Sequence, residues 1–226
     1  MKFFQSTIGL KITMALSGLV LVGFVIGHML GNLQIFLPDG KNALNDYATM
    51  LHKNAPLLWG ARVVLLASVL AHITSAVKLV MRSSSARPKQ YSQRGWLGAS
   101  YATRTMKHGG FILLAFIIFH LLHLTGAQLG DAKEACNAAG ECTEVYNNVV
   151  SGFSGSNAWI AIFYMIAQVF LGLHLTHGIH SAARSLGIAN PKRMRLAEKT
   201  AVAVGMLIMV GNISIPLAVL LGIISK

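Results

Sequence analysis

Five long apolar stretches constrain this chain more than any other feature of its sequence. They cover residues 11–37, 57–81, 105–129, 157–183 and 200–224. A spanning helix needs about 20 predominantly apolar residues, whereas a membrane β-barrel shows short strands of alternating hydrophobicity instead. The pattern therefore predicts an all-α membrane protein, with residues 1–226 forming a single domain of five transmembrane helices packed in a bundle.

The charged residues are few and unevenly distributed. Only 12% of the 226 residues are charged, about half the share of an ordinary soluble domain. The connections 82–107 and 184–199 are rich in Lys and Arg and contain only one acid, whereas the other two connections hold six of the seven acids. Basic connections stay on the cytoplasmic side, so we expect a cytoplasmic N-terminus and an outer C-terminus. This topology signal accounts for the net charge of +12, and we expect no nucleic-acid partner.

Histidines recur in each of the first four apolar stretches, at His28, His72, His120 and His174. A polar side chain within a membrane is costly unless it is paired, and it usually marks a cofactor, a relay or a transport path. At 1.5 Å per residue, His28 and His120 lie on the order of 3–6 Å on the outer side of their helix midpoints. By the same estimate, His72 and His174 lie roughly 4–6 Å on the inner side.

Two layers of two histidines, each pair from two helices, are the pattern expected for bis-histidine ligation of two haem b groups. Imidazole is a standard axial ligand of haem iron, and helix bundles hold cofactors between facing helices. His177 and His123, one turn from His174 and His120, are the reserve ligands. Hydrogen-bonded core histidines are the main alternative interpretation. A zinc site is less favoured because the stretches offer no acid or cysteine.

The second acidic connection carries the only two cysteines, Cys136 and Cys142. On the outer face of a membrane we expect them to form a disulfide. With no histidine near them in the sequence they make a weak metal site. His52, in the first outer connection, is expected to be solvated or interfacial.

The chain resembles a known family, the cytochrome b membrane-anchor subunit of diheme, b558-type, succinate dehydrogenases and fumarate reductases. The resemblance covers nearly the whole chain and depends on the joint order of short motifs. These motifs are Ile26-Gly27-His28-Met29, Ala71-His72, Gly110-Phe111 followed nine residues later by His120, and His174 followed by Gly178 and Gly187.

The resemblance implies specific roles. His72 and His174 would bind the proximal haem, nearer the cytoplasm, and His28 and His120 the distal haem. The chain would be the quinone-reactive part of an enzyme, a bacterial inner-membrane subunit with no dicarboxylate site or catalytic residue of its own. It would carry electrons between an iron–sulfur subunit, itself served by a flavoprotein subunit, and menaquinone or another quinone. Arg104, Lys107 and Arg184 would be partners for the haem propionates.

The chain departs from part of this family at one position. Some fumarate reductases carry a glutamate two residues before the ligand of the fourth helix, where it serves transmembrane proton movement. Here that position is Gly172, so we expect this proton route to be missing. The direction of turnover, succinate oxidation or fumarate reduction, stays open.

Two other functions also remain open from the sequence. A diheme cytochrome b subunit of a hydrogenase or formate dehydrogenase would use histidines from a different set of helices. A haem-free transporter or channel would line a path with these imidazoles, although such proteins commonly hold a carboxylate within the membrane, and the five predicted stretches contain none.

Overall fold

The computed structural model describes residues 3–86, 101–126 and 134–226, which are helical with no strand element. Five helices are long and apolar enough to span a membrane. They are α1 (Thr7–Asn32), α3 (Ala55–Ser85), α4 (Tyr101–Leu121), α6 (Ala158–Ser185) and α7 (Pro191–Leu220). The predicted all-α fold with five membrane-spanning helices is confirmed. Which terminus faces the cytoplasm stays a prediction.

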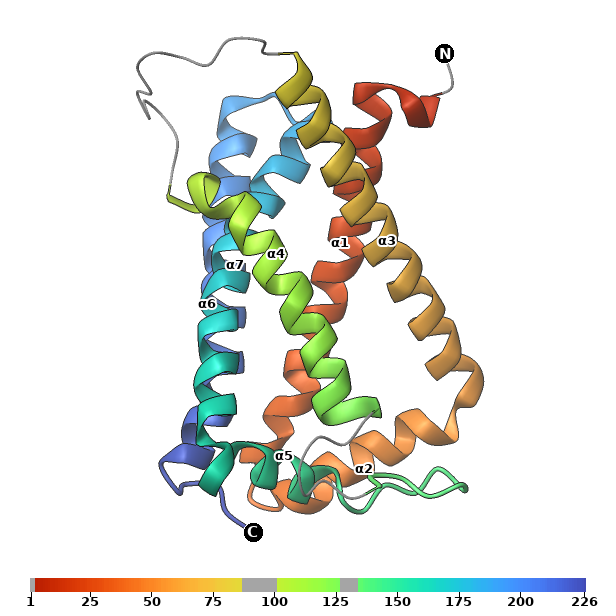
Figure 1. Ribbon diagram of the computed structural model, residues 1–226, viewed down its shortest axis with the longest axis vertical. Helices are drawn as coiled ribbons and strands as arrows, with labels where there is room; N and C mark the ends of the chain where they lie inside the picture. The colour runs from red at the N-terminus through yellow and green to blue at the C-terminus, as the bar shows by residue number, and fades with distance from the viewer. Residues whose placement is uncertain (1–2, 87–100, 127–133) are drawn as a thin grey trace.

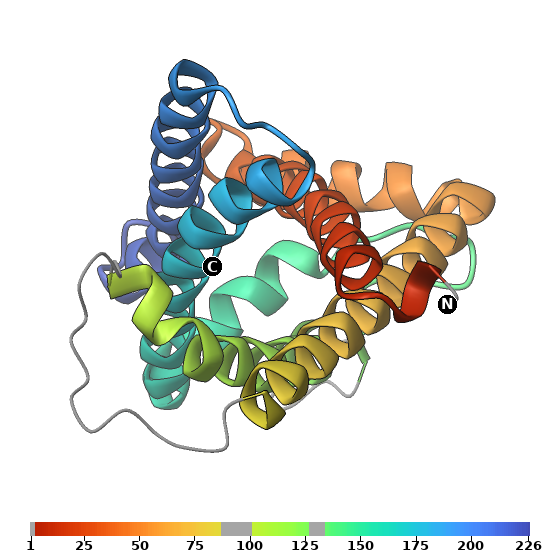
Figure 2. The ribbon, with the colours of Figure 1, turned by 90° about the horizontal axis from the view of Figure 1, so that it is seen from above.

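The spanning helices form a bundle whose N-terminus and C-terminus lie at opposite ends (Figure 1). Helix α1 packs against α3 and α6, and α6 packs in turn against α4 and α7. Viewed along the bundle, α1, α3, α4 and α6 surround its axis, and α7 lies outside them against α6 (Figure 2). Four helices, each carrying one of the predicted histidine ligands, therefore face a common interior.

The last spanning helix begins earlier than the sequence analysis placed it. It starts at Pro191 rather than near residue 200, so much of the predicted basic loop 184–199 is the first part of α7. The side chain of Asn190 accepts hydrogen bonds from the backbone N–H groups of Lys192 and Arg193, and proline suits the first position of a helix. As a result Glu198 lies on α7, where it is exposed.

Two short helices that were not predicted lie across the end of the bundle that holds the C-terminus (Figure 1). They are α2 (Gly40–Lys53) and α5 (Val145–Phe153), and they pack against each other. Asn45 links them: its amide donates to the carbonyl of Thr143 at 2.9 Å and its oxygen accepts from the N–H of Tyr146 at 3.1 Å. The described parts of the two outer connections thus form a folded cap.

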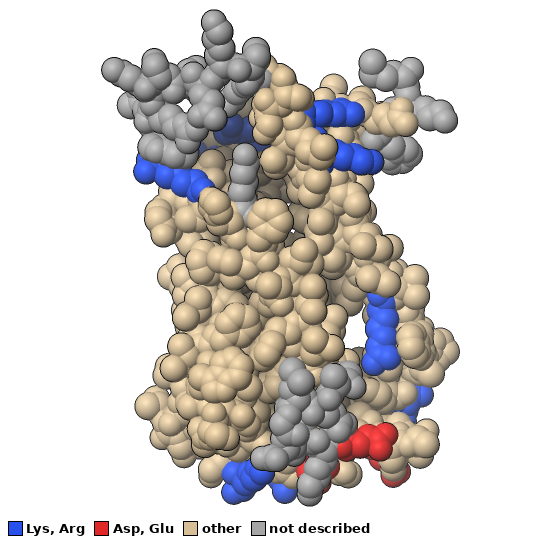
Figure 3. All heavy atoms as spheres, in the orientation of Figure 1, with Lys and Arg blue, Asp and Glu red and all other residues tan. Residues whose placement is uncertain are grey.

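The acidic side chains gather at one end of the bundle. On the face drawn in Figure 3 they lie only at the end that carries α2 and α5, whereas Lys and Arg occur at both ends. Many large apolar side chains of the spanning helices are exposed, Val63, Leu207 and Ile166 among them. Exposed apolar surface of this extent on helices of this length is what a lipid environment requires.

The larger buried cluster occupies the half of the bundle nearest the cap. It joins Phe116 of α4, Phe153 of α5 and Tyr164 of α6 to residues of α7 such as Ile215. A smaller cluster around Met29, Leu175 and Ile208 continues between α1, α6 and α7. Helix α3 contributes little to either cluster, because Ser75 is its only buried residue.

Candidate functional site

The end of the bundle nearest the N-terminus contains the first histidine pair. His72 of α3 and His174 of α6 face each other with ring centroids 6.2 Å apart and ring planes inclined by 58°. The two residues are more than 100 positions apart in the sequence and come from helices that both pack on α1. The structure therefore brings together the two imidazoles that the depth estimate placed in the inner layer.

A hydrogen bond to α1 fixes the orientation of His72. Its Nδ1 lies 3.0 Å from the backbone carbonyl of Met14. A carbonyl only accepts, so Nδ1 carries the proton and the lone pair is on Nε2. A Cβ atom at Gly18, one turn further along α1, would lie only 3.1 Å from Cε1 of this ring. Glycine at this position lets the imidazole lie directly against the α1 backbone.

His174 differs from His72 in the hydrogen bonding of its ring. Its Nδ1 is buried and has no hydrogen-bond partner among the residues that the structure describes. An unpaired buried ring nitrogen is costly in a folded protein. Coordination of a metal ion by this nitrogen is one way to satisfy it.

The second pair lies nearer the cap. His28 of α1 and His120 of α4 have ring centroids 5.8 Å apart and nearly perpendicular ring planes, at 84°. Each ring is stacked on a phenylalanine one turn before it on the same helix, Phe24 for His28 and Phe116 for His120. These contacts restrict the rotation of both imidazoles.

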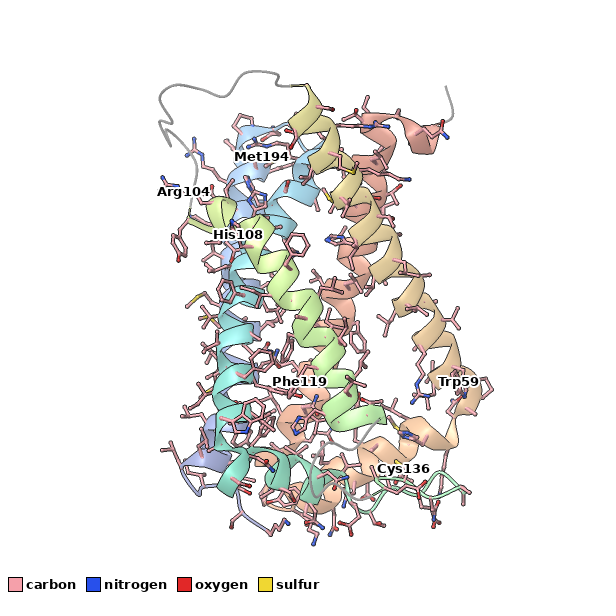
Figure 4. The ribbon with its side chains drawn as sticks, in the orientation of Figure 1. Trp59, Arg104, His108, Phe119, Cys136 and Met194 are labelled. Atoms are coloured by element: carbon pink, nitrogen blue, oxygen red, sulfur yellow. A yellow bond between two sulfur atoms is a disulfide. The ribbon has the colours of Figure 1, made fainter. Side chains whose placement is uncertain are left out.

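Tyr164 of α6 connects the outer pair to a further histidine. Its hydroxyl lies 3.1 Å from Nδ1 of His120 and 2.9 Å from Nδ1 of His123. His123 is almost fully buried, with 1% of its surface exposed, and it lies in the π-helical turn Leu122–Gly126 that follows α4. Phe119 of α4, labelled in Figure 4, packs against the rings of both His123 and Tyr164.

The two pairs form separate layers. Tyr164 belongs to the outer layer and His174 to the inner layer, and they lie roughly 15 Å apart along the axis of α6. Both layers are within the helices that are long and apolar enough to span a membrane. The arrangement therefore offers two similar sites in series across the bundle.

The spacing of each pair fits a metal ion held between two imidazoles. With metal–nitrogen bonds of about 2 Å and ring centres about 1 Å further back, two imidazoles on opposite sides of one ion have centroids roughly 6 Å apart. The ring centroids of the two pairs lie 6.2 and 5.8 Å apart. His72 and His120 each have Nδ1 hydrogen-bonded to an oxygen, the usual arrangement of a histidine that binds metal through its other nitrogen.

The reserve ligands also have Nδ1 hydrogen-bonded to an oxygen. Nδ1 of His177 lies 3.0 Å from Oγ1 of Thr103, and that of His123 lies 2.9 Å from the hydroxyl of Tyr164, so these bonds do not separate the reserve ligands from His72 and His120. His108 is exposed near the start of α4 together with Arg104 (Figure 4). The side chain of Lys107 lies outside the described residues. Sequence reasoning missed Tyr164, because one tyrosine in an apolar helix gives no periodic signal.

The cap contains the two cysteines. Cys136, labelled in Figure 4, is joined to Cys142 by a disulfide. The absence of a nearby histidine, inferred from the sequence, is wrong: the ring of His52 lies beside the pair, with the three ligand atoms within 4.8 Å of one another. The turn of α2 brings His52 there from a distant position in the chain. Sulfurs in a disulfide are not thiolate ligands, so the bonded form provides no metal site.

Comparison of the chain with protein-family models, with curated proteins and with solved structures finds no match.

Proposed function

We propose that this chain is the diheme cytochrome b membrane anchor of a succinate:quinone oxidoreductase. In this role it carries electrons between an iron–sulfur subunit and a membrane quinone, with menaquinone the quinone that the resemblance implies. The observation that carries the proposal is the pairing of imidazoles from four helices in two layers, with ring separations of 6.2 and 5.8 Å. When bound, each haem supplies an iron that accepts and releases one electron.

The residues of the chain have defined tasks in this proposal. His72 and His174 hold the inner group and His28 and His120 the outer group, each through a ring nitrogen. The carbonyl of Met14 and the hydroxyl of Tyr164 orient His72 and His120. The apolar surroundings of each layer would set the reduction potential together with the ligands and their hydrogen bonds. The partner subunits and the bacterial inner membrane are inferred from the resemblance.

A reduced-minus-oxidised absorption spectrum of the purified protein tests the proposal. We expect the bands of b-type cytochrome and two haems per chain by pyridine haemochrome assay. A protein purified from its native membrane without b-type bands would contradict the assignment and favour a transporter or channel lined by histidines. Co-purification tests the partners: a flavoprotein and an iron–sulfur subunit support this complex, whereas a hydrogenase or formate dehydrogenase subunit contradicts it.

A further inference from the structure

A second site lies at the opposite end of the bundle from the cap, where α1 begins and α3 and α6 end (Figure 1). These three helix ends surround a cavity of about 660 Å³. It lies outside both histidine pairs, and of its lining residues the resemblance assigns a role only to Arg184, as a partner for a haem propionate.

Three cations from three different helices line this cavity: Lys11 of α1, Arg82 of α3 and Arg184 of α6. The described residues that line it include no Asp or Glu, whereas Thr7, Ser83 and other lining residues add hydroxyl groups. Cations that converge without an acidic neighbour repel one another, and a cavity lined by one sign of charge attracts ions of the opposite sign.

The geometry of the rim supports an anion site. The guanidinium of Arg82 donates to Oγ1 of Thr7 at 3.3 Å and to the backbone carbonyl of Gln5. These bonds tie the end of α3 to the start of α1 and hold the guanidinium at the rim. Helix α1 also directs its N-terminal end toward this place, because Thr7 and Ile8 of its first turn line the cavity. The positive end of a helix dipole adds to the attraction of an anion.

Three apolar residues, Ile8, Met14 and Leu79, also line the cavity. One of them, Met14, is the residue whose carbonyl accepts from His72 of the inner pair. Leu79 lies roughly 10 Å beyond His72 along α3. A small anion alone would leave this apolar surface uncovered, so the cavity suits an anionic group attached to an apolar body.

We propose that this cavity binds the oxyanion of an amphiphile, with Lys11 and Arg184 as its main charged contacts and Arg82 as the anchored third. Two sources carry that chemistry. One is the phosphate of an anionic phospholipid of the adjacent leaflet, since basic pockets between membrane helices on the cytoplasmic side bind such head groups. The other is the carboxylate edge of a haem held by His72 and His174, and this source rests on the proposed function.

The test compares Lys11→Gln/Arg184→Gln in the full chain with Lys192→Gln/Arg193→Gln, which removes the same charge from exposed positions on α7. Arg82 is retained because it also holds α1 to α3. One arm measures binding of fluorescent phosphatidylglycerol and phosphatidylcholine in mixed micelles. The other arm measures the midpoint potential of each haem by redox titration.

If the site holds lipid, the cavity variant binds phosphatidylglycerol roughly thirtyfold more weakly, at about fivefold per cation, and binds phosphatidylcholine unchanged. If it holds the haem carboxylates, the potential of the inner haem falls, because two cations no longer favour the reduced state, and lipid binding is unchanged. Equal behaviour of the cavity and control variants in both arms overturns the proposal. If the purified chain contains no haem but still binds phosphatidylglycerol in preference to phosphatidylcholine, only the proposed function is refuted.

Discussion

The hydroxyl of Tyr164 lies 3.1 Å from Nδ1 of His120, and the same oxygen lies 2.9 Å from Nδ1 of His123. A phenol carries one proton, so at least one of these imidazoles donates to Oη. If His120 binds haem iron through Nε2, it is a donor, and the phenol proton is free to point at His123. Tyr164 then positions a ligand without touching the iron, and its effect is measurable on one haem only.

Tyr164→Phe is predicted to raise the midpoint potential of the outer haem and leave that of the inner haem unchanged. Without an acceptor for its Nδ1–H, His120 donates less electron density and stabilises oxidised iron less. Redox titration of the purified protein measures both potentials. Tyr146→Phe is the matched control, because its hydroxyl donates to the carbonyl of Ser225 in the cap, away from both pairs. A shift confined to the inner haem would contradict the assignment of Tyr164.

The assignment of His174 over its neighbour gives a second prediction. His174→Ala is expected to halve the haem content, because His72 alone does not hold the inner group, while His177→Ala keeps both haems. His177 has Thr103 as its partner, whereas the ring of His174 faces His72. The pyridine haemochrome assay gives haem per protein for each variant. If His177→Ala loses haem and His174→Ala retains it, the inner pair is displaced by one helical turn.

Close approach of α1 to the inner pair gives a third prediction. Gly18→Val is expected to displace His72 and to weaken or remove the inner haem, since even a Cβ at this position would lie 3.1 Å from Cε1 and 3.3 Å from Nδ1 of the ring. Gly23→Val is the control, because a Cβ there meets nothing within 4 Å. Both changes add the same side chain to α1. Equal haem content and spectra of the two variants would show that the contact with His72 is unimportant.

The sequence predicted most of what depends on the regular geometry of helices. Because rise per residue is constant, depth alone pairs His28 with His120 and His72 with His174, and the structure brings the same rings together. Their role as haem ligands stays a prediction. Tyr164 could not be ranked, because its importance arises from where α4 crosses α6, a relation that no local pattern encodes.

The cap shows what could not be predicted from the sequence. Helices α2 and α5 are too short to span a membrane and lie next to turn signals such as Pro38, so the sequence predicted loops there. Their helices are stabilised by contacts with each other and with the end of the bundle, and tertiary packing commonly decides the state of short helices. The start of α7 was more accessible to prediction, since Asn190 followed by Pro191 is a recognisable N-cap and first position.

Asn45 provides the fourth prediction, which tests this cap. It is 8% exposed, and Asn45→Ala removes both of its bonds to the segment that leads into α5. Two net hydrogen bonds amount to about 2 kcal/mol, so amide exchange in a peptide covering residues 143–150 should become roughly thirtyfold faster if that segment opens locally. Asn42→Ala is the control, because Asn42 is on the same helix but its amide donates to the exposed carboxylate of Asp39. Hydrogen–deuterium exchange measured by mass spectrometry compares the two variants, and the peptides of α6 serve as an internal reference.

Similar exchange of residues 143–150 in both variants would mean that Asn45 does not hold α5 to α2. The apolar contacts of Leu44, Val150 and Phe153 would then suffice to fold the cap.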